Sequence, residues 1–429
     1  MTEVQYLPVG LRPILIFGSV SLYQNHYLIK KHPKNLKLTT KTKIAIIGSG
    51  PAGLMLAARL DETKFEVHIY EKNSAPARKF LVAGDGGLNL THSEPLEQFI
   101  KRYTPVSFFE PILKTFSNAD LQAWFNRIGI ATYTGTSKRI FPEKGIKPIK
   151  VLTAILKVLK DKNVTLHTGY HWQGEDMNAD ITVFALGGAS WKITGSDGNW
   201  TTYFQNKGIE IVPFQASNCA FQINWPKNLI SLAAGLPLKN ISLKSLNIRK
   251  EGEVVITEFG MEGSGIYPLS PQIRQQLNEN IKAICYIDLK PSLSLSKVIE
   301  LLEKKPANST MTKYLDGTLN LSKAQLALLK NLTSKEDFTT PETLAAKIKE
   351  LPLEITGLAP IDEAISTVGG ISLSEIDENF QLKKRPGNYV IGEMLNWDAP
   401  TGGYLLQGSF SMGNKLAEYL NKSTVVDAG

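Results

Sequence analysis

The chain has 429 residues, of which 42% are hydrophobic and 21% charged, and this globular composition excludes a wholly disordered protein. Its length predicts two or three domains. The formal net charge is +8, but residues 1–42 hold five Lys and one Arg against one Glu. The remainder is therefore close to neutral, and no nucleic-acid partner is expected.

Cysteine content and hydropathy further limit the class of protein that is expected. Cys219 and Cys285 are the only two cysteines and lie far apart, so a dithiol redox enzyme with a CxxC motif is not expected. Scarce cysteine fits a reducing compartment, and we expect a cytoplasmic protein. No apolar run approaches the ~20 residues that span a bilayer, so no membrane contact is expected. Residues 1–42 are predicted to be an N-terminal extension, either disordered or derived from a start codon placed too early.

The strongest pattern is a strand followed by spaced glycines and a helix. Ile44–Ile47 is an apolar run typical of a buried parallel strand. Gly48, Gly50 and Gly53 then allow a tight turn, close approach of a pyrophosphate, and packing of the following helix on the strand. Glu71 ends the next predicted strand, where an acid accepts a hydrogen bond from a ribose hydroxyl. The pattern predicts a bound adenine dinucleotide, with a ligand-free strand–helix turn as the alternative.

A second glycine-rich segment lies between Lys79 and His92 and contains Gly84, Gly86 and Asn89. No alternating strand pattern flanks it, so a hairpin turn is not expected. Glycines at this density let a backbone lie flat against a ligand. The alternative is a mobile surface loop.

Residues 95–212 predict a mixture of helices and short strands. Ser196 and Asp197 are expected to cap the helix that ends near Gly208. His167 and His171 are four residues apart on a predicted strand, a spacing that does not suit a metal pair, so no metal site is expected. The predicted elements are helices within 95–129, a strand pair over 130–141 with a turn at 142–145, a helix over 149–159, and strands over 164–170 and 181–189.

Residues 213–365 show a different pattern and are predicted to form an insert domain. Partial alternation over 241–258 is typical of half-buried antiparallel strands. Helices are predicted over 270–277, 293–305, 322–332 and 341–351. We expect a β-rich domain with a small helical cap that shapes a substrate cavity; a purely structural insertion is the alternative.

From residue 366 the chain is predicted to return to the first domain. A predicted strand over 389–393 ends in Gly392 and Glu393, and Gly402 and Gly403 precede a predicted helix over 405–420. The N-terminus of a helix favours negative charge. A ribityl chain, and an isoalloxazine edge that becomes anionic on reduction, suit this position. The alternative is an ordinary glycine-rich helix entry, which would be preferred if the first glycine motif were absent.

These segments together resemble the aminoacetone-oxidase-like, or YhiN/BaiN-like, family of FAD-binding flavoproteins. The matching segments are spread over essentially all of residues 43–425, in the family's order: Gly48–Gly53, Lys79–His92, Ala185–Gly198, Glu262–Ser270, Ala359–Ile371 and Gly392–Leu406. The resemblance implies an α/β fold, with a glutathione-reductase-like FAD-binding Rossmann domain (43–212 and 366–425) interrupted by the insert domain (213–365). It also implies FAD contacts at Gly48, Ser49, Gly50, Ala52, Gly53, Glu71, Lys72, Lys79, Gly84, Gly86, Asn89, Gly187, Gly392, Glu393, Gly403, Tyr404 and Leu405.

The chain departs from the family pattern in the second glycine segment. Gly87 and Leu88 stand where many members have Arg-Cys, so a thiol beside the flavin is not expected. Asp85 stands where relatives tend to have Gly or a basic residue, and its charge is expected to weaken contact with the pyrophosphate.

The resemblance implies an FAD-dependent oxidoreductase that acts on a small amine, ketone or enone by hydride transfer at flavin N5. Because flavin accepts hydride without a side-chain base, no catalytic residue is assigned; Glu262, Tyr267, Thr367 and Trp397 are candidates for a general acid or base. No second GxGxxG follows a strand, so NAD(P)H or O₂ would react at a shared site. Two alternatives remain: a flavoprotein with a structural or sensory FAD, and an FAD-dependent RNA-modifying enzyme.

Overall fold

A computed structural model of the chain describes residues 41–83, 87–279 and 281–423. The expectations for residues 1–40, and those for Gly84, Asp85 and Gly86, lie outside these described residues.

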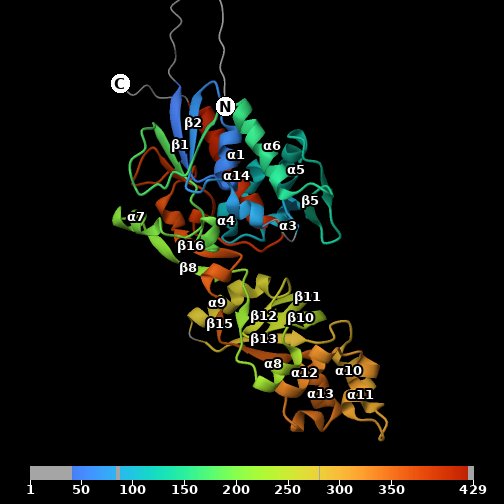
Figure 1. Cartoon of the computed structure of the whole chain (residues 1–429). Helices are drawn as coiled ribbons and strands as arrows, with labels where there is room; N and C mark the ends of the chain where they lie inside the picture. Colours follow the sequence, from blue (N-terminus) through green and yellow to red (C-terminus); the bar gives the residue numbers. More distant parts are fainter. Residues whose placement is uncertain (1–40, 84–86, 280, 424–429) are drawn as a thin grey trace, which may run out of the picture. The chain divides into compact units, whose positions relative to one another are not determined.

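A five-stranded parallel sheet contains the first glycine motif (Figure 1). All four strand pairings are parallel, and both faces of such a sheet are covered, which explains the continuous apolar run of its central strand. The strands, in order across the sheet, are β17 (Asn388–Val390), β7 (Ile181–Phe184), β1 (Thr42–Ile47), β2 (Phe65–Glu71) and β6 (Thr165–Thr168). Strand β17 therefore joins the sheet from a segment about 200 residues after β7.

One helix beside this sheet packs against two further helices. Helix α1 (Pro51–Arg59) begins with Pro51, whose fixed φ suits the first helical position. Helix α14 (Tyr404–Lys422) lies against α1, because Gly413 permits an unusually close approach: a Cβ there would be 2.4 Å from the Ala52 carbonyl oxygen. Helix α6 (Pro148–Asp161) also contacts α1.

The segment between β2 and β7 contains mostly short elements, and the predicted helices and strand pair are confirmed. Ser117 caps α5 reciprocally with Asp120. The elements are α2 (Arg78–Val82), α3 (Leu96–Ile100), α4 (Val106–Thr115), α5 (Asn118–Arg127), and an antiparallel sheet in the order β3 (Thr91–His92), β5 (Arg139–Pro142), β4 (Thr132–Thr134). Helix α7 (Thr201–Asn206) follows β7, and its N-cap residue Trp200 makes no side-chain capping bond, so the predicted cap by Ser196 or Asp197 is wrong.

The chain leaves and re-enters this region through one antiparallel pair. Strand β8 (Ile211–Ser217) leads out and β16 (Ser366–Ile371) leads back. Gly369 and Gly370 both have positive φ, and a Cβ at Gly370 would be 2.2 Å from the Met394 carbonyl oxygen. Only glycine allows this contact between the returning strand and the loop after β17.

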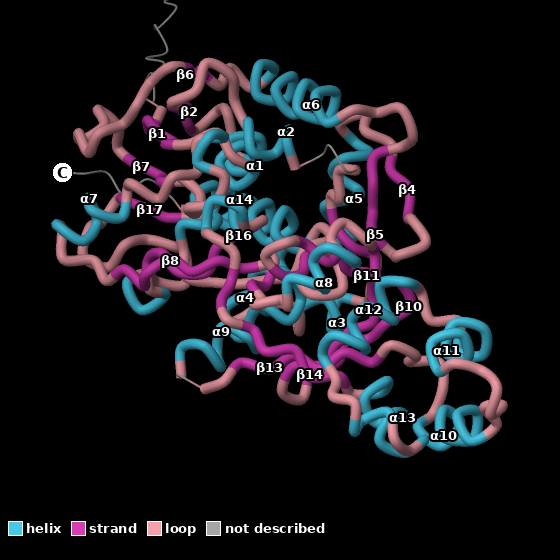
Figure 2. The backbone as a smooth tube through the Cα atoms, turned by 60° about the horizontal axis from the view of Figure 1, so that its bottom comes forward, coloured by secondary structure: helices cyan, strands magenta, loops and turns pink. Residues whose placement is uncertain are grey.

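The part of the chain that follows β8 and precedes β16 forms a seven-stranded sheet with helices, in agreement with the predicted β-rich character (Figure 2). Its order is β14 (Leu351–Ile355), β13 (Ala283–Asp288), β10 (Pro237–Ser245), β11 (Ile248–Thr257), β12 (Gly260–Glu262), β9 (Phe221–Gln222), β15 (Gly357–Leu358). Its helices are α8 (Lys227–Ala233), α9 (Ser270–Asn278), α10 (Leu295–Glu303), α11 (Met311–Leu319), α12 (Lys323–Leu332) and α13 (Pro341–Lys349). The sequence did not predict α8 or α11.

Two large hydrophobic cores divide the described residues. One contains side chains from residues 44–209 together with 371–420, and the other contains side chains from residues 221–355. The predicted boundaries at 213 and 366 remain a prediction, and they fall between these two cores. No helix in the described part of the chain is long and apolar enough to cross a membrane.

Candidate functional site

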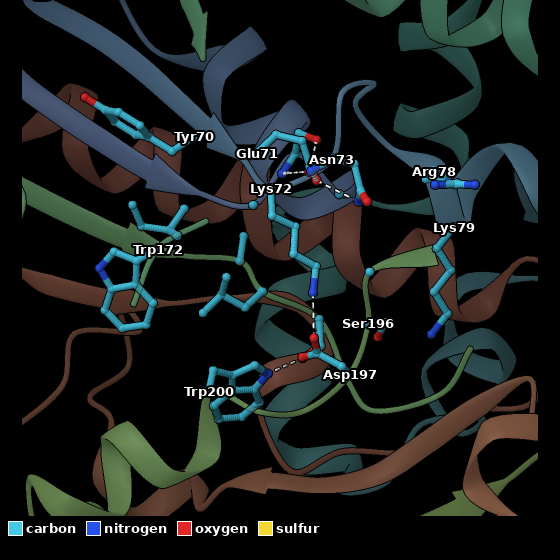
Figure 3. A pocket seen from close by; sticks show the side chains of 18 of the residues that line it. Tyr70, Glu71, Lys72, Asn73, Arg78, Lys79, Trp172, Ser196, Asp197 and Trp200 are labelled. Atoms are coloured by element: carbon cyan, nitrogen blue, oxygen red, sulfur yellow. Dashed lines mark hydrogen bonds and ion pairs between the residues drawn. The ribbon is translucent and has the colours of Figure 1, made fainter. Parts of the chain in front are cut away.

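A cavity of about 360 Å³ lies at the carboxyl ends of the parallel strands (Figure 3). In open α/β sheets ligands bind at this edge, because the loops that leave the strands converge there. Eight of the predicted FAD contacts line the cavity: Gly48, Ser49, Gly50, Glu71, Lys72, Lys79, Gly187 and Glu393. The cavity therefore brings together residues from the first glycine motif, the end of β2, helix α2, the segment after β7, and the segment after β17.

The three glycines of the first motif have different surroundings. A Cβ at Gly48 would be 2.3 Å from the Ala185 carbonyl oxygen, and one at Gly53 would be 2.4 Å from the Gly48 carbonyl oxygen. These two positions serve strand and helix packing. A Cβ at Gly50 would meet no atom within 4 Å. Gly50 thus faces open space at the N-terminus of α1, where a pyrophosphate can approach the backbone.

Glu71 is a buried carboxylate that already accepts four hydrogen bonds (Figure 3). Its Oε2 accepts from the backbone amide and hydroxyl of Ser49, and its Oε1 accepts from the amide at 2.8 Å and the side-chain Nδ2 of Asn73 at 2.9 Å. A carboxylate offers about four acceptor sites. A ribose hydroxyl would therefore have to replace one of these donors, and the side chains of Ser49 and Asn73 are the replaceable ones.

Two lysines cross the cavity to acidic partners. Lys72 Nζ lies 2.7 Å from Asp197 Oδ2, and Lys79 Nζ lies 3.2 Å from Glu393 Oε2 and 2.8 Å from Ser190 Oγ. Burial raises the pKa of Asp197, but hydrogen bonds from Lys72 and the Asn199 amide outweigh it, so this pKa lies below its usual value. Both cations are thus neutralised locally, and phosphate binding would depend mainly on backbone amides.

Aromatic side chains form one end of the cavity, and sequence reasoning missed them. Tyr70 and Tyr170 pack with ring centroids 4.8 Å apart, and Trp172 packs edge-on against Tyr203 at 4.7 Å. A hydrogen bond to Glu175 raises the pKa of Tyr170 to about 12. A neutral aromatic wall of this kind suits a purine ring. The available indication was topological: residues that follow β6 emerge at the same edge of the sheet as those that follow β2.

The remaining predicted contacts do not line this cavity. Ala52 and Gly53 lie in the first turn of α1, where their amides have no hydrogen-bond partner among the described residues. Asn89, Gly392, Gly403, Tyr404 and Leu405 lie elsewhere, and several of them gather at the start of α14. Tyr404 is held there by its hydroxyl, which donates to Glu94 Oε1 at 2.6 Å.

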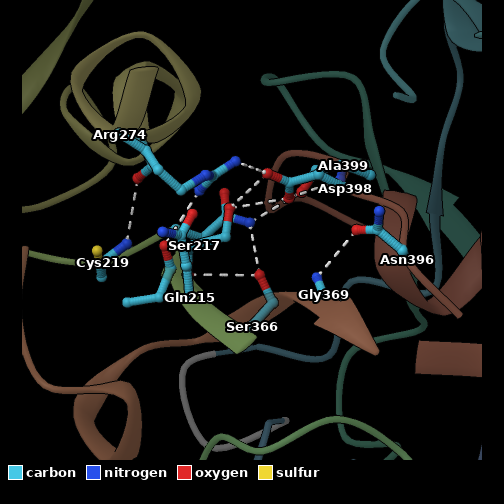
Figure 4. Close-up of polar contacts among 12 residues, drawn as sticks. Gln215, Ser217, Cys219, Arg274, Ser366, Gly369, Asn396, Asp398 and Ala399 are labelled. Carbon is cyan, nitrogen blue, oxygen red and sulfur yellow. Dashed lines mark hydrogen bonds and ion pairs between the residues drawn. The ribbon is translucent and has the colours of Figure 1, made fainter. Parts of the chain in front are cut away.

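A buried polar network joins α9 to the loop before α14 (Figure 4). Arg274 Nη2 lies 2.7 Å from Asp398 Oδ2, and Ser217 Oγ donates to both carboxylate oxygens at 2.8 Å. Asn218 Nδ2 donates to Ser366 Oγ and to the Ala399 carbonyl, both at 2.8 Å. The network fixes the exit and return strands to the segment that leads to Gly402 and Gly403; the sequence did not indicate it.

None of the four candidates for a general acid or base lines the cavity. Thr367 is buried and accepts from the Ala189 amide at 3.2 Å, and Trp397 is buried and donates to the Gly392 carbonyl at 2.8 Å. Glu262 is exposed at the end of β12. Tyr267 is half-buried, and burial raises its pKa. Their proposed chemical roles gain no support from these contacts.

The fold and the cavity define a dinucleotide-binding Rossmann protein. The chain matches the family described as HI0933-like protein Rossmann domain over residues 42–419 and belongs to that family.

The chain aligns with almost the full length of two relatives. The chain is 25% identical over 403 residues to a 3-dehydro-bile acid delta(4,6)-reductase of Clostridium scindens, covering 86% of this chain and 97% of the relative. It is 22% identical over 386 residues to a ribosomal RNA dihydrouridine synthase of Escherichia coli, covering 85% and 94%. A 3-ketosteroid-delta4-(5alpha)-dehydrogenase structure from Rhodococcus jostii covers 90% of this chain and is itself covered to 99%, at a TM-score of 0.44 and 11% identity.

The chain is therefore a flavoprotein oxidoreductase with FAD as its cofactor. Its cavity fits that group. Gly50 faces open space beside free amides of α1, as a pyrophosphate requires. The Oγ of Ser196 is buried in the cavity wall without a hydrogen-bond partner among the described residues, and a bound dinucleotide would supply one.

Proposed function

We propose that this protein is a reductase of small organic molecules in which a carbon–carbon double bond is conjugated with a carbonyl group. Within the broader amine, ketone or enone class, the names of the two relatives support this choice, because both describe saturation of such a system: a 3-keto bile acid in one case and the uracil ring of uridine in the other. FAD that an electron donor has reduced would supply hydride from N5 to the β-carbon and return to its oxidised form, and a proton would complete the addition at the α-carbon.

The protein's part in this reaction is to bind, orient and shield. Both cysteines are buried, and burial raises the pKa of Cys219 to about 11 and of Cys285 to about 12. No thiolate is therefore available for a dithiol relay at neutral pH. Direct hydride exchange between flavin and substrate remains the simplest chemistry for this chain.

The charge of the insert favours a small substrate over RNA. Residues 213–365 contain 17 Lys and Arg against 16 Asp and Glu. Many of these cations are paired, as Lys244 is with Glu350 and Lys282 with Glu354. An RNA-binding surface requires an excess of positive charge that faces phosphates. An enzyme that modifies ribosomal RNA, as the name of the second relative suggests, is thus the second candidate.

The test reduces the flavin chemically, so that it does not depend on the physiological donor. The FAD-loaded protein is reduced anaerobically with dithionite just to the endpoint and mixed with a 3-keto-4-ene steroid, a simple amine-derived imine, or ribosomal RNA transcript. We expect the enone alone to restore the oxidised flavin absorbance, with a product two mass units heavier. Reoxidation only by RNA, with dihydrouridine formed, would support the second candidate. Oxidation of amines by the oxidised flavin, with no enone reduction, would contradict the proposal.

A matched control uses Gly50→Val, whose side chain would fill the open space at the start of α1. This variant is expected to fold without FAD and to give no turnover. NADH and NADPH are then offered separately to the wild-type protein. Bleaching by either would identify the donor, whereas a flavin that no donor reduces would favour a structural or sensory cofactor.

A further inference from the structure

Residues 127–162 concentrate positive charge in one part of the Rossmann domain. They contain nine Lys and Arg against two Asp and Glu. Of the formal net charge of +8, residues 1–42 carry +5 and residues 127–162 carry +7, so the remaining residues carry −4. The small net charge outside residues 1–42 therefore conceals one strongly basic segment. This segment includes the last residue of α5, the hairpin of β4 and β5, and helix α6.

Helix α6 carries exposed lysines along one side. Lys150, Lys157 and Lys160 follow one another at intervals of seven and three residues, which places them on the same face of a helix. Lys147, at the N-cap, extends this face by one turn. At a rise of 1.5 Å per residue, the four lysines form a row about 20 Å long. The buried residues of α6 occupy the other side of the helix: Val151, Leu152, Ile155 and Leu159.

The lysine row, Lys147, Lys150, Lys157 and Lys160, has no acidic partner in the described part of the chain. Within residues 127–162, the only ion pair with a described residue joins Lys162 to Glu62.

Other helices of this chain place an acid four residues from an exposed lysine, as the pairs in α4, α10 and α14 show. Helix α6 also has no acid in its first turn, so Lys147 and Lys150 lie unfavourably at the positive end of the helix dipole. An anionic partner would relieve this repulsion.

An exposed aromatic ring lies in the same basic segment. Tyr133 on β4 is 38% exposed and stacks on Phe141 of β5, with ring centroids 5.6 Å apart. A short turn joins β5 to α6 and is closed by a hydrogen bond from the Ile146 amide to the Glu143 carbonyl at 3.0 Å (Figure 2). The sequence therefore interleaves an exposed ring with the cations, and aromatic rings of this kind stack on unpaired bases.

We propose that the lysine row and the β4–β5 hairpin form a surface that binds single-stranded RNA. The row would contact phosphates, and Tyr133 would stack on a base. The exposed hydroxyls of Thr134, Thr136 and Ser137 in the hairpin would bind the ribose 2′-hydroxyl, the group that distinguishes RNA from DNA.

An anionic membrane is the other partner that the charge suits. A helix that binds a membrane buries its apolar face among the lipids, whereas the apolar side chains of α6 are buried within the protein. RNA can use both the charges and the exposed ring, and it is therefore favoured. The inference requires neither bound FAD nor enone reduction, so it can fail separately from the proposed function.

The test measures binding of the full-length, FAD-loaded protein to a labelled RNA hairpin with a long single-stranded loop, by fluorescence anisotropy at several salt concentrations. The variant combines Lys150→Gln, Lys157→Gln and Lys160→Gln. We expect its affinity to fall about tenfold or more. Each phosphate contact to a single strand contributes about 0.7 to the slope of log K against log salt concentration, so the slope should become shallower by about two.

The matched control removes the same charge from the insert. It combines Lys227→Gln, Lys313→Gln and Lys330→Gln, three exposed lysines of α8, α11 and α12 that form no ion pair with a described residue. This control should keep the affinity and the salt slope of wild type. Residues 1–42 are present in every variant, so their charge contributes equally throughout.

Two single variants separate the contributions of stacking and of charge. Tyr133→Ala should weaken binding about fivefold or more and leave the salt slope unchanged, because it removes a stacked base and no charge. Lys150→Glu should weaken binding while Tm stays the same or rises, because an acid in the first turn suits the helix dipole. A loss of binding in Lys150→Glu is then separated from a loss of folding.

Four results would overturn the proposal. The first is an equal loss of affinity in the insert control, which would show a general charge effect. The second is equal affinity for DNA of the same sequence, which would contradict the choice of RNA. The third is binding to vesicles that contain phosphatidylserine without binding to RNA, which would make this face a membrane surface. The fourth is no binding to either partner, which would make the lysine row an ordinary solvated face.

Discussion

Replacing Arg274 with Met should destabilise the protein strongly. The side chains of Arg274 and Asp398 are only 11% and 7% exposed, and they form an ion pair between α9 and the loop before α14. Removing one partner of a buried pair leaves the other charge uncompensated, at a cost of about 3–5 kcal/mol. Asp398 would keep hydrogen bonds from Ser217 and from the Ala399 amide. We therefore expect the lower end of that range, about 3 kcal/mol.

Differential scanning calorimetry of the FAD-loaded protein measures this loss. For a domain of about 150–250 residues, each kcal/mol shifts Tm by about 2–4 °C, so Tm should fall by roughly 6–12 °C. The reference variant is Lys304→Met, which breaks an exposed pair with Glu300 and should leave Tm unchanged. Methionine preserves much of the apolar stem in both variants, so that lost packing contributes little to the difference.

A double-mutant cycle separates the pair from its surroundings. Asp398→Asn alone should destabilise as well, because it leaves Arg274 buried without a counter-charge. The double variant Arg274→Met with Asp398→Asn should be more stable than the sum of the single changes predicts. A Tm in Arg274→Met equal to that of the Lys304→Met reference would refute the reasoning, since it would mean that water or another donor replaces the guanidinium freely.

Two further predictions concern the glycine motif and acid stability. Gly50→Ala should leave Tm of the FAD-free protein unchanged, because the new Cβ meets no atom within 4 Å, yet weaken FAD binding at least about tenfold in a titration followed by flavin fluorescence. Gly53→Ala should instead lower the Tm of the FAD-free protein, because overpacking destabilises the fold by about 1–3 kcal/mol. Equal effects of Gly50→Ala and Gly53→Ala on Tm would contradict this reasoning. Burial raises the pKa of Glu94, but hydrogen bonds from Arg102 and Tyr404 outweigh it, so its folded pKa lies below the ordinary value of about 4.3. Its contribution is complete above that ordinary value and is lost as the pH falls through the folded pKa, so Glu94→Gln should show a shallower fall in Tm below about pH 5 than wild type; parallel curves would exclude this role.

Local spacing explains what could be predicted from the sequence. Strand, glycines, helix and terminal acid follow one another within 30 residues, and backbone geometry alone relates them, so Gly48, Gly50 and Glu71 meet at one cavity as expected. The same locality explains one error. Asp197 was assigned to a nearby helix as a cap, whereas Lys72, 125 residues earlier, binds its carboxylate instead. The fold brings the Lys72 ammonium group to the Asp197 carboxylate, and this ion pair forms in place of a bond to the amides of the neighbouring helix.

Long-range contacts explain most of what was missed. Arg274 and Asp398 are 124 residues apart, and neither belongs to a sequence motif that predicts an ion pair. Tyr170 and Trp172 follow a short strand with no glycine signature, so only the order of strands in the sheet places them beside Glu71. Such residues can be assigned to a site only when the topology is known, because the sequence pattern around them predicts only the local conformation.

The buried polar network also shows how the strands that enter and leave residues 213–365 are held together. Asn218 binds Ser366 and the Ala399 carbonyl through Nδ2, and its Oδ1 accepts from the Thr401 amide at 3.1 Å. One side chain thus fixes the exit strand, the return strand and the loop that runs into Gly402. Because Asn218 has φ 51°, a conformation that asparagine tolerates better than most residues, this arrangement depends on its identity. A change at Asn218 would therefore disturb all three segments at once.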